Sequence, residues 1–429
     1  MERANGSTAY GNPADGQAEI VFSDLDEKVA GVLGNLSTRA CAIDKRCMSS
    51  KVPGYVGDYL LARYGDDEVG LQKAFRVLFS AYFVSKGMPP IGNETICRVF
   101  GMRRVDADVY GITTTSPLLH RLGIEGDVIR VRGLLDGSWC QLSISRQIDE
   151  RITALHLFDN VPQEDLVTSG SIANHSIDAL QPIREEVESV KRVLRLRSLL
   201  TTEEWVLLLL RSYGLGGEGL DFSGRLRLLS RIAPLAEPGL RVLYVHDDEC
   251  ARSFEMSPYE VLVEQLRPDH EGFPGSWDCV AVDGEPKRRA YELSMLLDEY
   301  EGIATGVSVA AVCDGSVMRE SELTMLFGPF HLVIRVSNGY EGDRGSDAEH
   351  LGVNRCLLGE LWHELRNRGM PHELETMIEG ASGLSASRRE AARLALSGIA
   401  KVLYPDGVLS VAEAKELIEF VLPETHPND

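Results

Sequence analysis

The sequence predicts an α/β protein with a mainly parallel central sheet, a mixed α+β region before that sheet and helices after it. Four short apolar segments have the length and composition of buried strands, and amphipathic helical segments alternate with them. Strands that alternate with helices are typical of βαβ units, whose strands run parallel. The strand candidates are residues 240–245, 277–283, 307–314 and 331–336.

The chain is long enough for several domains. Its 429 residues, 44% of them apolar, can bury two to four cores. We predict a disordered tail over residues 1–22, because the residues there are small and polar and show no periodicity. A mixed α+β N-terminal domain is expected over 23–180, the sheet-containing core over 181–345 and a helical region over 346–429.

The N-terminal domain is expected to start with helices and continue with strands. Helical periodicity begins at Asp24 and recurs in 53–64 and 70–83, and the helical spacing of the aromatic residues there favours a core over a base-stacking platform. Strand-like alternation replaces it between 91 and 149. Residues 150–185 are weakly patterned, so we expect them to connect two domains.

Helices are predicted on both sides of the central strands. Residues 185–198 are helical in pattern, and Thr201 or Thr202 is suited to cap a second helix that ends at Tyr213. The following run 214–219 matches G-x-G-x-x-G, but it follows a helix and not a strand, so it is predicted to be a loop. Further helices are expected at 356–367, 373–378, 387–403 and 411–422.

Composition limits the classes of function. The net charge of −21 and pI near 5.0 oppose nonspecific adhesion to DNA or anionic lipid, so a nucleic-acid contact needs a local basic patch. The eight cysteines are scattered without a C-x-x-C pair, which favours a reducing cytosol and argues against zinc. The longest aliphatic run, 206–210, is far shorter than the roughly 20 residues that span a bilayer. We therefore predict a cytoplasmic protein without membrane contact, metal or cofactor.

The first core strand resembles the strand before a phosphate-binding loop, but the loop's chemistry is missing. Such a loop needs glycines, a lysine and Ser/Thr, because backbone N–H groups must turn inward and a positive charge must meet the phosphates. Residues 246–253 contain no glycine and include Asp247, Asp248 and Glu249. Each carboxylate about 4 Å from a phosphate oxygen costs about 1 to 4 kcal/mol. We therefore expect no useful affinity for ATP.

The second core strand ends in Asp283, in the manner of a Walker B strand whose acid holds Mg²⁺. Gly284 follows, where an AAA+ enzyme has the glutamate that orients water. From these two strands alone, an α/β core that never bound nucleotide remains an equal alternative.

Several segments resemble, in order along the chain, the Lon-like AAA+ family BrxL of BREX phage-defence systems. The similarity covers about residues 24–422. It implies an AAA+-like, P-loop-type αβα core followed by a helical lid, with ring assembly and DNA binding in phage restriction. The segments are 52–61, 137–140, 202–215, 257–259, 277–283 and 397–407.

The resemblance also assigns individual positions. Asp283 matches the Walker B aspartate, Asp314 falls where the family has a sensor asparagine, and Arg393 lies near a lid arginine. Where the family has Gly-Thr-Gly-Lys-Ser, this chain has Glu-Cys-Ala-Arg-Ser at 249–253, and a C-terminal Lon-like domain with its Ser/Lys dyad is expected to be missing. The resulting remnant of a nucleotide site, expected to be inactive, comprises Arg252, Ser253, Asp283, Asp314 and Arg393.

Other catalytic motifs are incomplete. His363-Glu364 and His372-Glu373 begin like H-E-x-x-H, but neither has a second histidine four residues on, so we expect solvated histidines at helix ends. No G-x-S-x-G elbow occurs. No catalytic residue is therefore predicted. Basic residues suited either to phosphate contact or to a solvated or interface surface are Arg103, Arg104, Lys191, Arg192, Arg195 and Arg197.

Together these features predict a non-catalytic, BrxL-like pseudo-ATPase that scaffolds or regulates a BREX-type defence system. It would assemble as a homo-oligomer or as a hetero-oligomer with an active AAA+ paralogue. The alternatives are a DNA-binding module of that system, an atypical active ATPase that uses Arg252, and a remnant without a selected role. Arg252 is a poor substitute for the compact charge of lysine.

Overall fold

The computed structural model describes fourteen segments of the chain, separated by gaps. The described residues are 22–38, 52–85, 94–98, 102–106, 109–112, 129–132, 137–148, 173–215, 220–246, 256–262, 277–282, 306–314, 330–336 and 350–425. The tail predicted over 1–22, apart from its last residue, and the helical pattern at 288–300 lie outside them.

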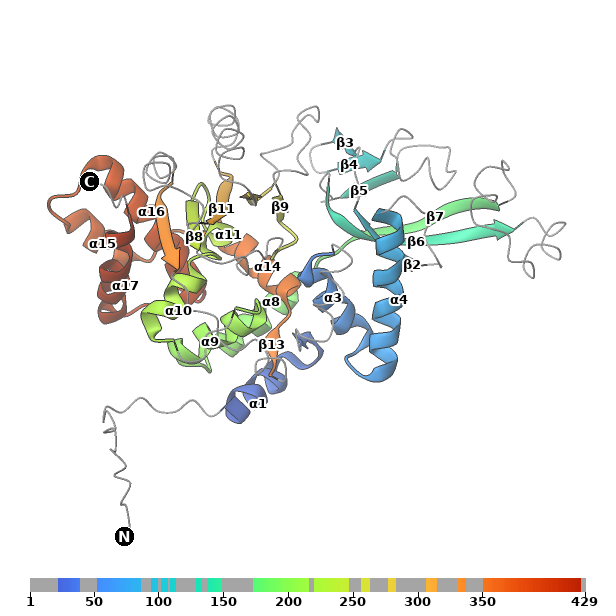
Figure 1. Cartoon of the computed structure of the whole chain (residues 1–429), viewed down its shortest axis with the longest axis horizontal. Coiled ribbons are helices and arrows are strands. Elements are labelled where there is room, and N and C mark those ends of the chain that lie inside the picture. The colour runs from blue at the N-terminus through green and yellow to red at the C-terminus, as the bar shows by residue number, and fades with distance from the viewer. Residues whose placement is uncertain are drawn as a thin grey trace, which may run out of the picture.

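A five-stranded parallel sheet forms the centre of the structure (Figure 1). Its strand order is β12-β8-β11-β10-β9, and every neighbouring pair runs parallel. The sheet confirms the predicted α/β architecture and is compatible with an AAA+-like core. The strands are β8 (Arg241–His246), β9 (Glu260–Leu262), β10 (Cys279–Val282), β11 (Ser308–Asp314) and β12 (Leu332–Val336).

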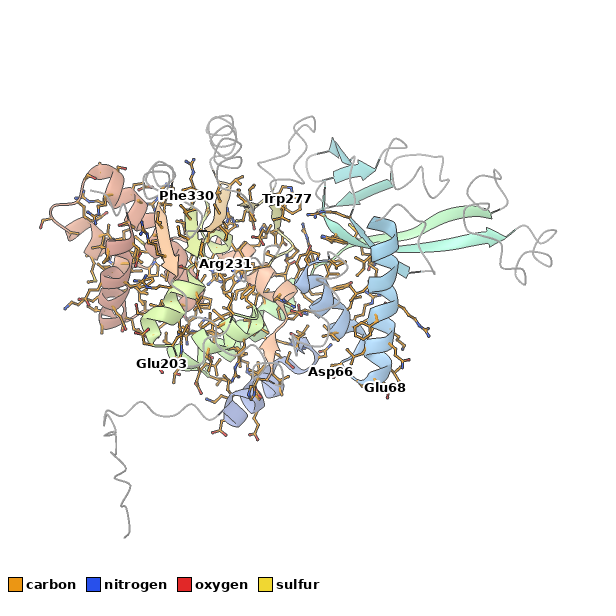
Figure 2. The ribbon with its side chains drawn as sticks, in the orientation of Figure 1. Asp66, Glu68, Glu203, Arg231, Trp277 and Phe330 are labelled. Atoms are coloured by element: carbon orange, nitrogen blue, oxygen red, sulfur yellow. The ribbon has the colours of Figure 1, made fainter. Side chains whose placement is uncertain are left out.

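Both faces of the sheet are buried, as is usual for parallel strands. Val242 and Ala310 belong to the main hydrophobic core, whereas Leu243 and Val309, which point to the opposite face, are also almost fully buried. The side chains of Trp277 and Phe330, each two residues before β10 and β12, are buried close to the start of these strands (Figure 2).

Four helices precede the sheet in the chain and contribute to its main core. They are α8 (Val187–Arg197), α9 (Thr202–Ser212), α10 (Phe222–Leu229) and α11 (Ala233–Ala236). Thr201 caps α9 as predicted, in a reciprocal capping box with Glu204. All residues of α9 from Trp205 to Ser212 are buried, so α9 is a central helix and not a surface one.

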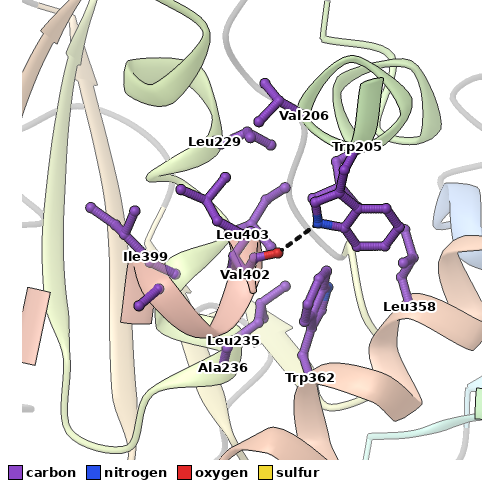
Figure 3. Close-up of a cluster of buried hydrophobic side chains, with 14 of the residues drawn as sticks. Trp205, Val206, Leu229, Leu235, Ala236, Leu358, Trp362, Ile399, Val402 and Leu403 are labelled. Atoms are coloured by element: carbon purple, nitrogen blue, oxygen red, sulfur yellow. Dashed lines mark hydrogen bonds between the residues drawn. The ribbon is translucent and has the colours of Figure 1, made fainter. Parts of the chain in front are cut away.

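Four C-terminal helices complete the same core and confirm the predicted helical segments. They are α14 (Arg355–Leu365), α15 (His372–Gly380), α16 (Ala386–Leu403) and α17 (Val411–Glu424). Trp205 Nε1 donates a hydrogen bond of 2.9 Å to the Val402 carbonyl oxygen, which joins α9 to α16 beside Trp362 (Figure 3).

The start of the described chain packs into this core as well. Helix α1 (Phe22–Leu33) buries Leu25, Val29 and Leu33 in the main core, and a 3-10 turn, η1 (Gly34–Leu36), follows it. Strand β1 (Ser37–Thr38) then pairs antiparallel with β13 (Gly352–Val353). The predicted domain boundary at 180/181 remains a prediction, but α1 shares its packing with the residues beyond that boundary.

A second hydrophobic core lies under an antiparallel sheet of order β2-β6-β7. Its elements are α3 (Gly54–Tyr64), α4 (Glu68–Ser85), β2 (Glu94–Arg98), β6 (Trp139–Ile148) and β7 (Ala173–Pro182). Residues 150–185, which we expected to connect two domains, include the strand β7, which the sequence did not predict. This polar segment forms a ten-residue strand because it pairs with β6, and such pairing overrides weak local propensity.

A third sheet has the antiparallel order β3-β4-β5 (Figure 1). It comprises β3 (Met102–Asp106), β4 (Val109–Ile112) and β5 (Ile129–Arg132). In the described part of the chain, no helix has the length and apolar character required to span a membrane.

Candidate functional site

The carboxyl ends of β8, β11 and β10 lie side by side in the parallel sheet. His246 is in register with Asp314, and Val282 is in register with Ala311. The chain leaves β8 for β9 at one edge of the sheet and leaves β11 for β12 at the other, so the connections after these two neighbouring strands run in opposite directions. Ligands of open α/β sheets bind outside the carboxyl ends at such a point.

Two residues of the predicted nucleotide-site remnant come at the carboxyl ends of these strands in the sequence. Asp314 is the last residue of β11, and Asp283 directly follows Val282, the last residue of β10. The side chain of Asp314 and the whole of Asp283, Arg252 and Ser253 lie outside the described part of the chain. The sheet therefore places the end of β10, after which Asp283 follows, and the end of β11, which is Asp314.

Arg393 lies toward the opposite edge of the sheet. Its guanidinium donates hydrogen bonds of 2.8 and 2.7 Å to Glu390. This contact raises the pKa of Arg393 and lowers that of Glu390. The charge of His331 acts on Glu390, and the charge of Glu237 acts on Arg393. Since His331 and Glu237 precede β12 and β8, the pair lies near the amino ends of these strands. The structure does not bring Arg393 to the carboxyl edge.

A polar network occupies this amino edge. Asp278, directly before β10, contacts His363 Nδ1 at 2.6 Å and Arg366 Nε at 3.4 Å. Arg366 donates a further bond of 3.2 Å to Ser308 Oγ at the start of β11. His363 lies in the last turn of α14 with its side chain 45% exposed, and its ring also stacks on Tyr259 with centroids 4.0 Å apart.

A buried ion pair extends the network to α16. Lys401 Nζ lies 2.7 Å from Glu237 Oε2, and Ser397 donates a 2.6 Å hydrogen bond to the same oxygen. Both charged side chains are less than 10% exposed. Buried charges with such partners fix neighbouring elements in place. The amino-edge network therefore holds α14 and α16 against the sheet.

A second polar cluster joins α3 to α14. Asp58 accepts hydrogen bonds from the backbone N–H of Arg355 at 2.8 Å, from its Nε at 2.8 Å and from its Nη2 at 2.9 Å. Asp58 is 1% exposed. The close approach needs Gly54, because a Cβ there would overlap the Arg355 guanidinium. Neither buried cluster had a local signal in the sequence.

The basic residues of α8 divide into a surface group and a buried one. Lys191 is exposed and pairs with Glu188 at 2.6 Å, while Arg192 and Arg195 are exposed on the same helix. Arg197 is buried and donates to the carbonyl oxygen of Leu403 at 3.0 Å, so it serves packing. Lys191, Arg192 and Arg195 are the α8 residues that a nucleic acid could reach.

Arg103 and Arg104 lie on β3, opposite Gly111 and Tyr110 of β4, and their side chains lie outside the described part. Within the segments that the structure describes, no group of three His, Cys, Asp or Glu side chains is arranged to hold a metal ion.

Comparisons with known proteins agree with this geometry. The family model described as "Lon-like protease BrxL-like, ATPase domain" matches residues 175–263, from β7 through β8 to just beyond β9. Two curated relatives bear the name "Lon-like protease BrxL". The relative from Bacillus cereus (strain H3081.97) is 21% identical over 459 residues, covering 94% of this chain and 65% of its own length. The one from Escherichia coli O9:H4 (strain HS) is 22% identical over 440 residues, covering 87% and 59%.

The parallel sheet and the matched ATPase-domain model are those of an α/β protein compatible with an AAA+-like core. Over most of its length the chain is similar to BrxL-like proteins. It spans 59 to 65% of the length of these two curated relatives.

Proposed function

We propose that this protein is a non-catalytic AAA+-like member of the BrxL-like family, which scaffolds or regulates a BREX-type phage-defence system. The observation that carries the proposal is the connection between β8 and β9, where a phosphate-binding loop would be required. Both its length and its residues are unsuited to that task.

The length of the connection argues against a phosphate site. It comprises 13 residues, 247–259, and the last four, 256–259, form a turn before β9. Nine residues remain for a phosphate-binding motif of about eight residues and the crossover helix whose N-terminus would face the phosphates. The whole connection between two parallel strands needs a dozen or more residues, so the 13 present are close to the minimum for the crossover without any added motif. The connection therefore lacks room for both parts.

The distance to be covered strengthens this argument. The chain must return from the carboxyl end of β8 to the amino end of β9, about 20 Å along six strand residues, and must pass β11 and β10, about 14 Å across the sheet. Nine helical residues rise only about 14 Å. A fully helical connection is thus too short for the crossing, and the acidic residues 247–249 would repel a triphosphate.

The finer assignments belong to the same proposal. We assign 23–180 to an N-terminal domain, 181–345 to a degenerate AAA+ core and 346–429 to the counterpart of the helical lid, after a tail at 1–22. Their order along the chain and the similarity to BrxL relatives support this division. The protein would act in the cytoplasm, as a homo-oligomer or together with an active AAA+ paralogue.

Nucleotide binding and turnover test the loss of catalysis. Isothermal titration with ATP and Mg²⁺ up to about 1 mM, the upper range of ordinary KM values, should give no saturable binding. Phosphate release should equal that of buffer, while a known AAA+ ATPase assayed in parallel turns over. Mg²⁺-dependent hydrolysis that Asp283→Ala abolishes would overturn the proposal and favour the atypical ATPase.

The scaffold role has a separate test. Size-exclusion chromatography with light scattering should give an oligomer of the chain itself or a mixed complex with a catalytically active BrxL paralogue. A strictly monomeric chain that fails to associate with such a paralogue would contradict this role, whatever the nucleotide experiment shows.

DNA binding is the second candidate function, favoured by the exposed cations of α8. A gel shift that weakens steeply with salt is expected from this surface, and each lost phosphate contact should lower the salt slope by about 0.9. The variant Arg192→Glu/Arg195→Glu should lose binding, while Lys73→Glu/Arg76→Glu on the exposed side of α4 serves as the charge-matched control. Equal binding by both variants would exclude the α8 surface.

A further inference from the structure

A four-residue linker, Ile183–Glu186, joins the antiparallel sheet to α8 and lies along α14. Ile183 is 1% exposed; its N–H donates to the Trp139 carbonyl oxygen at 3.0 Å, and its own carbonyl oxygen accepts from Cys356 Sγ at 3.7 Å. The linker is therefore bound to β6 on one side and to α14 on the other.

The next residue of the linker is held by an aromatic ring. The Arg184 guanidinium lies 4.5 Å from the ring centroid of Tyr259, and the His363 ring stacks against the same ring at 4.0 Å. Both distances fit only if the two groups take opposite faces of Tyr259. The Tyr259 hydroxyl donates a 2.6 Å hydrogen bond to Glu360 Oε2.

Glu185 makes the contact on which the inference rests. Asn354, which is fully buried, uses its Oδ1 to cap α14 by accepting from the Cys356 and Leu357 N–H groups. Its Nδ2 is therefore aimed outward and donates to Glu185 Oε1 at 3.0 Å. When Glu185 is protonated on its other oxygen, Oε1 can still accept the hydrogen bond from Asn354. The contact therefore persists in the neutral form of Glu185.

The charges around Glu185 favour a neutral form. The carboxyl groups of Glu360, Glu186 and Asp58 act on Glu185, and Arg184, His363 and Glu364 act on Glu360. Arg355 is engaged by both oxygens of Asp58. Burial leaves the charged form of Glu185 poorly solvated, and its three carboxyl neighbours disfavour that form further.

His363, the other cationic group that acts on Glu360, contacts Asp278 at 2.6 Å. Burial raises the pKa values of Tyr59 on α3 and Cys356 on α14, which stay uncharged near neutral pH, and Glu186 is exposed and adds negative charge. Burial, opposed by the Asn354 hydrogen bond and reinforced by Glu360, raises the pKa of Glu185 to about 7.

We propose that the Ile183–Glu186 linker is a proton-controlled latch, which holds the antiparallel sheet to α14 while Glu185 is neutral and loosens when Glu185 ionises. The latch thereby makes the joint between the N-terminal sheet and the rest of the protein sensitive to pH.

The sign and size of the effect follow from linkage. The pKa of Glu185 is about 4.5 when the linker is open and about 7 when it is closed. Closure is therefore fully stabilised below pH 4.5, and this stabilisation is lost as the pH rises through 7. For these two values the opening equilibrium should increase about tenfold between pH 6 and pH 8.

Hydrogen exchange of the full chain, followed by mass spectrometry, measures this opening. Protection of the peptide that covers residues 183–190, after correction for the intrinsic pH dependence of exchange, should fall about tenfold from pH 6 to pH 8. Glu185→Gln keeps the acceptor but cannot ionise, so its protection should be independent of pH. Glu186→Gln removes the neighbouring exposed charge and should retain the wild-type dependence.

Three results would overturn the latch. Wild-type protection could be flat across this range, Glu185→Gln could keep the full dependence, or Glu360→Gln alone could abolish it, which would put the proton on Glu360. Circular dichroism checks that each variant is folded. The wild-type measurement decides the first point even if Glu185→Gln does not fold.

Discussion

Replacing Asp58 by asparagine should release the ion pair that fastens α3 to α14. Asparagine keeps the volume of the side chain, so the change removes charge without leaving a cavity. It leaves the Arg355 side chain, which is 9% exposed, without the carboxylate that meets its Nε and Nη2.

The expected loss is large. Removing one partner of a buried ion pair costs about 3 to 5 kcal/mol, because the other charge is left buried and uncompensated. A folded protein has a total stability of only about 5 to 15 kcal/mol. Asp58→Asn should therefore remove about a fifth or more of the total stability, with the loss centred on the region around α3 and α14.

Urea unfolding followed by tryptophan fluorescence measures this loss, with hydrogen exchange of α3 as a local readout. Glu188→Gln is the matched control, because it breaks the exposed Lys191 pair on α8 and should cost less than about 1 kcal/mol. The double variant Asp58→Asn/Arg355→Met removes both buried charges and should recover much of the stability.

The reasoning would be refuted in either of two ways. Asp58→Asn might cost no more than Glu188→Gln, which would mean that Arg355 finds water or another acceptor. Alternatively, the double variant might be less stable than Asp58→Asn by itself, which would mean that the aliphatic part of Arg355, and not its charge, carries the contact.

Three further changes have expected outcomes in the same unfolding assay. Trp205→Phe removes the Nε1 donor to the Val402 carbonyl oxygen near the end of α16 and should cost about 1 to 3 kcal/mol; an unchanged midpoint would show that water replaces it. Gly359→Ala brings a methyl group against Pro258 and should cost about 1 to 3 kcal/mol, whereas Gly31→Ala, which meets nothing within 4 Å, should be neutral or stabilising. Thr201→Ala removes a capping box and should cost about 1 kcal/mol; no loss would mean that the cap is dispensable.

The sequence predicted those parts of the fold that local pattern controls. β8, β10, β11 and β12 are continuous apolar segments, and such segments identify buried parallel strands. β9 escaped prediction because it has only three residues and begins with Glu260, so its pairing with β10 defines it. β7 was missed for the same reason, since only its partner β6 makes it a strand.

The candidate site divides in a similar way. Asp283 and Asp314 could be assigned to the carboxyl edge because each ends or follows an apolar strand. The amino-edge network could not be predicted, because Glu237, Asp278 and Lys401 are far apart in the chain and meet only through the fold.

The pairing of β1 with β13 has a consequence for biosynthesis. Thr38 has Gly352 as its partner, so the ribosome must add more than 300 residues between them. Because synthesis adds about 5 to 20 residues per second, β13 is completed roughly 15 to 60 s after β1. A nascent chain halted before residue 352 holds an open strand edge at its very beginning, a place where chaperones or neighbouring chains can bind.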